Sequence, residues 1–332
     1  TLEGRTVRLA GSGSLGLQDH RLDGSADLRL DDLRPVAAAA GSAASGGGGL
    51  SASVGGTVQP LALAGRVSAA GHGLVTGIAA VDALLGPGPR IDAPFTWDER
   101  AGLDVSALRI DGRNLAGEGK LRLPPGAGPL DAQLRLAVPT LAPLSDAAGT
   151  PLRGRLTLDA EARGAVADPQ ASVVLRLQDA AVDTTRIASA RAELRAVTLL
   201  SRPTGRLTLD GTTDLGPLSA VTDFILEDNR RLRLTPITAR GLGIAVDGTV
   251  QADLAGPLAN GQLHIASEAP DHGIRFGETA LRGPLGIDVR LLPQRAQQRV
   301  VVAVRGGPLS LRQGAAEQLA IDGLTGDATL DD

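Results

Sequence analysis

LRGRLTLDAEARGAVADPQASVVLRLQ, residues Leu152–Gln178, is the stretch that decides the fold class of this chain. From Arg155 to Arg163 it alternates strictly between polar and apolar side chains. Side chains of a strand point to opposite faces with a period of two, so this pattern predicts a strand with one apolar and one polar face. Gly164–Pro169 (GAVADP) favours a turn, and the alternation then resumes through Leu177. The stretch predicts a β-hairpin with a loop of several residues.

The composition favours a thin, extended sheet over a compact globule. The 332 residues include only four aromatic side chains and no Tyr, Met or Cys. Aromatic residues usually anchor compact cores, so Leu, Val and Ala must carry the burial here. The chain has 44 glycines, well above ordinary usage, which predicts frequent turns. Disorder is the alternative, but disordered segments lack sustained apolar alternation.

The charge distribution argues against a nucleic-acid-binding protein. The net charge is −4, and Arg alternates with Asp and Glu along the same predicted strands. A basic patch with stacking aromatic residues, which nucleic-acid binding would require, is missing from the sequence. The sequence has no signal peptide, no initiator Met and no run of 18 strongly apolar residues. Because it begins and ends inside alternating patterns, we expect it to be an internal piece of a longer protein.

Three regions are expected along the chain. Residues 1–36 begin a β-repeat region, 37–49 form a Gly/Ala/Ser-rich loop or linker, and 50–332 continue the repeats without a separate catalytic domain. Residues 77–85 (GIAAVDALL) have apolar side chains at helical spacing and predict one short helix. We expect the other segments with apolar alternation, about twenty in number, to be strands of one sheet.

No group of residues indicates an enzyme, a metal site or a cofactor. GSGSLG at 11–16 matches the dinucleotide-binding pattern, but that motif must open a helix, and residues 17–31 contain Gly24 and then alternate like a strand. We therefore interpret residues 11–16 as a hairpin loop. His264, His272 and Asp271 could be drawn as metal ligands, yet no helical spacing supports them. The acidic residues lie opposite Arg, which is typical of a solvated strand face.

The apolar strand face is the informative feature, because a sheet must cover such a face. Only one short helix is predicted, so the cover is a second sheet, the same sheet curled over on itself, or an apolar ligand. A curled sheet gives a trough lined by Leu, Val, Ile and Ala, which suits acyl chains. A self-packed sandwich with a dry core is the alternative, and these patterns alone do not decide between the two.

Two long phrases resemble the AsmA-like superfamily, most closely its TamB (translocation and assembly module) group. They are LDAQLRLAVPTLAPLSDAAGTPLRGRLTLDAEARGAVADPQASVVLRL at 130–177 and GIAVDGTVQADLAGPLANGQLHI at 243–265. The resemblance implies a periplasmic segment of a protein anchored in the inner membrane of a Gram-negative bacterium. It further implies a curled sheet called a β-taco, which carries phospholipid between the inner and outer membranes. An alternative implied role is outer-membrane assembly with a barrel protein as partner.

The combined prediction is an all-β protein with a long curled, mainly antiparallel sheet that forms a β-taco-like groove. The competing function is a structural or adhesive β-repeat stalk with a dry core. If the resemblance holds, the aliphatic face lines a path for phospholipid acyl chains. The expected lining is Leu134, Leu136, Val138, Leu156, Leu158, Val173, Leu175, Leu177, Leu207, Leu209, Leu232, Leu234, Val246, Leu263, Ile265, Val289 and Leu291.

Overall fold

The structure of the chain is a computed structural model that divides into two units. The first unit comprises Thr1–Pro169 with Ala180–Asp183, and the second comprises Gln170–Asp179 with Thr184–Asp332. The described residues are 2–3, 7–39, 41–126, 128–182, 185–256, 258–267, 274–276, 279–294, 297–313 and 316–331.

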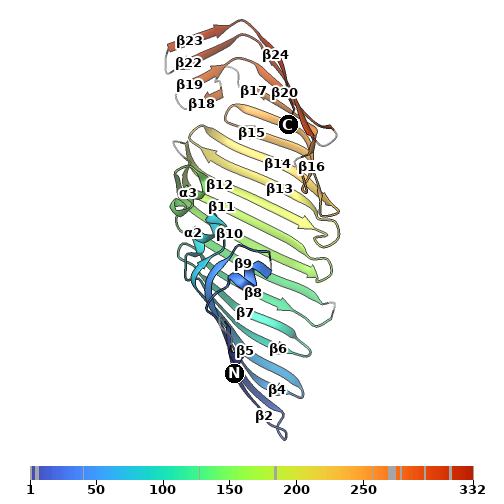
Figure 1. Cartoon of the computed structure of the whole chain (residues 1–332). Coiled ribbons are helices and arrows are strands. Elements are labelled where there is room, and N and C mark those ends of the chain that lie inside the picture. The colour runs from blue at the N-terminus through green and yellow to red at the C-terminus, as the bar shows by residue number, and fades with distance from the viewer. Residues whose placement is uncertain are drawn as a thin grey trace. The chain divides into compact units, whose positions relative to one another are not determined.

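The first unit is an antiparallel ladder in which each strand pairs with the next one along the chain (Figure 1). Its strands are β1 (Leu2–Glu3), β2 (Val7–Leu15), β3 (Arg21–Leu30), β4 (Ser45–Val58), β5 (Leu61–Val75), β6 (Arg90–Asp98), β7 (Gly102–Asp111), β8 (Ala116–Leu123), β9 (Pro129–Val138) and β10 (Leu152–Ala165). Short helices occupy three of the connections: α1 (Arg34–Ala39), α2 (Ala79–Leu85), the 3-10 helix η1 (Ala142–Leu144) and α3 (Ser145–Ala148).

The second unit contains a main antiparallel ladder and a small sheet. The ladder runs through β12 (Thr185–Val197), β13 (Thr204–Thr213), β14 (Gly216–Glu227), β15 (Arg231–Gly241), β16 (Ile244–Asp253), β17 (Ala259–Ser267), β20 (Leu285–Gln294), β21 (Gln297–Gly306) and β24 (Leu324–Asp331). The small sheet consists of β18 (Ile274–Phe276), β19 (Thr279–Arg282), β22 (Leu309–Gln313) and β23 (Ala316–Ile321). Strand β11 (Gln170–Val182) contributes residues to both units.

The predicted fold class is confirmed. Strands account for 72% of the chain and helices for 6%, and the strand pairing is antiparallel. The segment that decided the prediction forms β10 and β11, joined by a turn at residues 166–169. The helix predicted over residues 77–85 is present as α2. The helices η1 and α3 were not predicted, because segments of three and four residues are too short to show a helical spacing of apolar side chains.

Neither unit has a closed hydrophobic core among its described residues. Each strand contacts chiefly its ladder neighbours, so no second layer packs on the sheet within a unit. None of the described side chains is less than 2% exposed. The chain exposes 20110 Å². A compact globular protein of 33.7 kDa would expose about 12,700 Å² by the usual size relation. The sheets are therefore thin layers with two accessible faces.

Two predictions about glycine-rich segments are wrong. Residues 11–16 were expected to form a hairpin loop, but strand β2 continues to Leu15 and pairs with β3, with Gly13 opposite Gly24. The linker expected over 37–49 ends early, because β4 begins at Ser45. Added side chains at Gly46 and Gly47 would collide with Gly73 and with the ring of His72. The glycines are needed there because neighbouring strands approach closely, and not because the chain is flexible.

Helix α2 is held at both ends. The Asp82 carboxylate accepts hydrogen bonds from the backbone N–H and the hydroxyl of Thr76, at 2.6 and 2.7 Å. Near the other end, the carbonyl of Leu85 accepts from the N–H of Arg113, and that of Leu84 accepts from the N–H of Asn114. A helix of seven residues has little stability of its own, so these contacts to the β5 end and the β7–β8 turn fix it in place.

Candidate functional site: two aliphatic sheet faces

One face of the first unit carries an unbroken row of apolar residues across the ladder, which we call the first apolar face. The row is made of residues that lie directly opposite one another on successive strands. It crosses nine strands, from β2 to β10, without a polar side chain. The row is Leu9, Leu28, Leu50, Ala69, Ile91, Ile110, Gly117, Leu136 and Leu158. Since the partners are in register, their side chains form one continuous surface.

The second unit has an equivalent surface, the second apolar face, built from parallel rows that cross from β12 to β24. One row is Ala192, Leu209, Ala220, Ala239, Val246, Ile265, Ile287, Val304 and Gly326. Another is Ala196, Gly205, Phe224, Leu234, Val250, Gly261, Leu291, Val300 and Leu330. A third row includes Leu207, Leu263 and Val289 and has Thr222 as its one hydroxyl-bearing member.

The residues predicted to line the groove fall on these faces. Leu134, Leu136 and Val138 alternate on β9, and the last two lie opposite Leu158 and Leu156 of β10. In the second unit, all nine predicted residues from Leu207 to Leu291 lie on the second apolar face. Val173, Leu175 and Leu177 occupy alternate positions of β11 and so share one face of that strand. Their proposed contact with lipid remains a prediction.

Sequence reasoning missed the beginning of the first apolar face. Leu9, Leu28, Leu50 and Ile91 belong to the same row as the predicted Leu158. Alternation was visible around Leu28, but Gly and Ala on the neighbouring strands diluted the pattern. The register supplies the missing signal, because a Gly or Ala in one strand lies opposite a large residue in the next.

The apolar faces are substantially exposed to solvent. Leu9, Leu50 and Ile91 of the first face are 41%, 42% and 43% exposed, and Leu207 of the second is 41% exposed. The burial that does occur is local: Val138 is 4% exposed. Contiguous apolar surface of this extent is unusual on a soluble protein. Such a surface is typical of a site that a ligand or a partner covers.

The opposite face of each ladder is charged and self-neutralising. In the first unit, the cross-strand row from β6 to β10 reads Asp92, Arg109, Glu118, Arg135 and Asp159. Arg135 Nε donates to Asp159 at 2.8 Å, and Arg135 Nη1 lies 3.9 Å from Glu118. Its hydrogen bond to Asp159 raises the pKa of Arg135 above its ordinary value. Such cross-strand pairs of opposite charge contribute modestly to the stability of the sheet.

Neither of the weaker ligand interpretations is supported by the geometry. The helix that a dinucleotide site requires is not present after residues 11–16, which are mostly strand. In the part of the chain that the structure describes, no cluster of three or more His, Asp or Glu side chains could hold a metal. His264 Nδ1 instead lies 2.8 Å from Asp288 Oδ1, whose pKa it lowers. His272 and Asp271 lie outside the described residues.

None of the helices in the described ranges is long and apolar enough to cross a bilayer. Comparison with known proteins adds no relative: no protein-family model, curated protein or solved structure matches this chain.

Proposed function

We propose that this chain is a segment of a lipid conduit in which the two apolar faces carry phospholipid acyl chains. The observation that carries the proposal is the in-register aliphatic surface, which crosses strand after strand without a charge and is still partly exposed. Covering such a surface releases about 0.8 kcal/mol for each methylene buried, so a lipid chain needs no directional bond to stay there. The resemblance to the TamB group supports the same function, and with it a periplasmic location in an inner-membrane-anchored parent protein.

The absence of a polar side chain in the row of the first unit supports movement along the face. A ligand that moves from one strand to the next exchanges one aliphatic contact for another, so no step requires a charge to be desolvated. Tight binding at any one strand would slow this exchange. The proposed role of the residues is therefore passive, and no catalytic group is part of it.

The test is lipid occupancy of the chain and of a double variant, Leu158→Asp with Leu209→Asp. These residues lie on the first and second apolar faces, one in each unit. The control is Thr157→Asp with Thr212→Asp, which introduces the same charges on the opposite faces of the same two strands. Each protein is purified from a bacterial periplasm and analysed by native mass spectrometry with lipid extraction.

We expect phospholipid to co-purify with the unchanged chain and with the Thr control, and to be lost from the Leu variant while circular dichroism still reports β-structure. A lipid-free, folded chain that takes up no added phospholipid would refute the conduit and favour a structural stalk. Loss of β-structure in the Leu variant alone would show that Leu158 and Leu209 form a dry core.

A further inference from the structure

The two edges of the sheet in the first unit differ in their connections. Successive strands of an antiparallel meander alternate in direction, so the connections that come after β3, β5 and β9 lie at one edge, and those that come after β2, β4 and β6 lie at the other. The first set contains α1, α2, η1 and α3, and we call this edge the helical edge. The second set consists of the short connections 16–20, 59–60 and 99–101, and we call this edge the turn edge.

The first apolar face is covered by protein at the helical edge and open at the turn edge. Val138, at the end of β9, is 4% exposed, and Leu141, in the connection that follows it, is 8% exposed. At the turn edge, Leu15 ends β2 and is 52% exposed. A lipid on this face can therefore keep its polar headgroup in water at the turn edge.

The only tryptophan of the chain lies on the first apolar face close to the turn edge. It belongs to a row that crosses seven strands, from β2 to β8: Leu15, Leu22, Gly56, Leu63, Trp97, Leu103 and Leu123. Trp97 is 41% exposed, and it is the one member of the row whose side chain has a hydrogen-bond donor. The row is otherwise aliphatic.

The indole of Trp97 combines the two properties that the boundary between a lipid tail and its headgroup requires. The ring offers a large apolar surface, and its N–H is a donor. Among the described residues, this N–H has no acceptor. A glycerolipid presents ester carbonyls at the same boundary, where they are the first acceptors above the acyl chains. Trp is enriched at the headgroup level of bilayers because of the same two properties.

Strand β6 is long enough to hold an acyl chain that begins at Trp97. Trp97, Phe95, Ala93 and Ile91 alternate along the strand and share the apolar face, since their partners on β5 are Leu63, Gly65, Val67 and Ala69. From Trp97 to Ile91 the strand spans about 20 Å at about 3.3 Å per residue. An acyl chain in a bilayer spans about 15 Å, half of a hydrocarbon core about 30 Å thick. The apolar part of β6 therefore covers its whole length.

We propose that Trp97 binds the ester region of a glycerolipid whose acyl chains extend from the turn edge along β6 toward Ile91. This inference rests on the proposed function and adds to it an orientation and a ligand class. The headgroup lies in water at the turn edge, and the indole N–H donates a hydrogen bond to an ester carbonyl. The lipid class is therefore one with acyl esters.

The orientation is tested with two phosphatidylcholines that carry a nitroxide, a short-range quencher of fluorescence, either close to the ester or close to the terminal methyl of one acyl chain. Each lipid is loaded on the full chain from vesicles, which are then removed, and the bound lipid is measured by extraction. Trp97 is the first probe. The second is a bimane fluorophore on Ile91→Cys, which is uniquely labelled because the chain has no other cysteine.

We expect the nitroxide close to the ester to cause the larger loss of Trp97 fluorescence, and the terminal nitroxide to cause the larger loss at position 91. The same ranking at both positions, or no quenching at either although lipid is bound, would overturn the orientation and leave the conduit intact. A chain that retains no lipid would overturn the conduit itself.

The hydrogen bond is tested with dihexanoyl phosphatidylcholine and its diether analogue, which lacks the ester carbonyls. Titration calorimetry measures the binding of both to the unchanged chain, to Trp97→Phe and to the control Phe95→Leu, which alters an aromatic ring on the same face of β6. We expect the unchanged chain to bind the ester about two- to tenfold more tightly, as one hydrogen bond allows. Trp97→Phe should lose this preference, and the control should keep it. A preference that persists in Trp97→Phe, or is missing from the unchanged chain, would overturn the assignment of the ester to Trp97.

Discussion

The pairing of Gly65 with Phe95 on the first apolar face allows a stability prediction. The two residues are direct partners on β5 and β6, and a Cβ atom added at Gly65 would lie 2.7 Å from Phe95 Cζ. It would also collide with the carbonyl oxygen of Ser53 on the other neighbouring strand. The glycine is thus a gap that the phenyl ring fills, and the second unit repeats the arrangement with Gly205 and Phe224.

Gly65→Ala should therefore destabilise the first unit. Overpacking costs about 1–3 kcal/mol, and the gain from replacing a strand glycine by alanine offsets about 0.5–1 kcal/mol of it. The difference is about 0–2.5 kcal/mol. Because one collision is with a backbone oxygen that cannot rotate away, we expect a net loss in the upper part of this range, about 1–2 kcal/mol. With a urea dependence of about 2 kcal/mol per molar, this lowers the unfolding midpoint by about 0.5–1 M. Trp97, the one tryptophan of the chain, lies two residues beyond Phe95 and reports this unfolding by fluorescence.

Gly24→Ala is the matched control, because Gly24 lies in the same cross-strand row as Gly65. Its added Cβ would meet Ser12 O and Val54 Cγ1 only at 3.6 Å, which is ordinary van der Waals contact. We expect this variant to be as stable as the unchanged chain or slightly more stable. In a Phe95→Leu background, Gly65→Ala should cost less, with a coupling energy of at least about 0.5 kcal/mol. Equal midpoints for the two alanine variants would refute the account of the packing.

Two further predictions concern charged groups. The pKa of Asp82 is lowered by hydrogen bonds from the backbone N–H and then the hydroxyl of Thr76. The contribution of Asp82 to the stability of the folded state is therefore complete above the pKa of this residue in the unfolded chain, near 4. It is lost as the pH falls through the lower pKa that Asp82 has in the folded chain. Protection of the α2 amides, which is the intrinsic exchange rate at each pH divided by the observed rate, should fall over this acidic range in the unchanged chain. Equal protection in Asp82→Ala and in the unchanged chain at neutral pH would contradict the anchoring role. Arg135→Gln should lower the urea midpoint at low salt, and the difference should vanish near 1 M salt, where exposed pairs are screened.

The sequence was sufficient to predict the strands and the aliphatic face, because their periodicity is local. Leu156 and Leu158 alternate with polar residues, and this fixes the face that each side chain occupies before any partner strand is known. The glycine-rich strands could not be predicted, because their conformation depends on the neighbours. Position 47 of strand β4 requires glycine, because the ring of His72 and the backbone of β3 leave no room for a side chain. This requirement is a property of the register and not of the segment.

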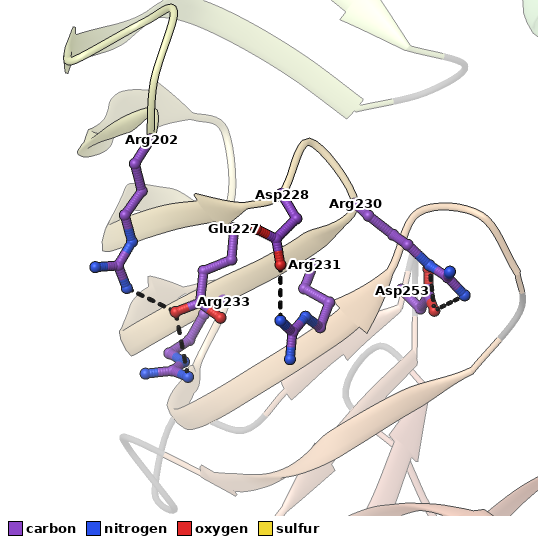
Figure 2. Close-up of polar contacts among 7 residues, drawn as sticks. All are labelled: Arg202, Glu227, Asp228, Arg230, Arg231, Arg233 and Asp253. Atoms are coloured by element: carbon purple, nitrogen blue, oxygen red, sulfur yellow. Dashed lines mark hydrogen bonds and ion pairs between the residues drawn. The ribbon is translucent and has the colours of Figure 1, made fainter.

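The contact of Arg202 and Arg233 with Glu227 illustrates the same limit for ion pairs (Figure 2). The two arginines have 30 residues between them in the chain. Only the strand register brings both side chains to Glu227. A sequence pattern reports which face of a strand a residue occupies, whereas the grouping of strand ends requires the lengths of the intervening strands and turns.

The two faces differ in a way that bears on the proposed function. On the charged face, arginines pair with carboxylates of neighbouring strands, as Arg206 does with Asp223 at 2.6 Å. These charges therefore have partners within the sheet. The apolar face has no such internal solution, because aliphatic side chains in one layer can cover one another only at their edges and Leu50 and Leu207 remain over 40% exposed. The remaining free energy is available to an apolar ligand that lies on the rows, and since no single residue provides most of it, the ligand can be held without being fixed at one strand.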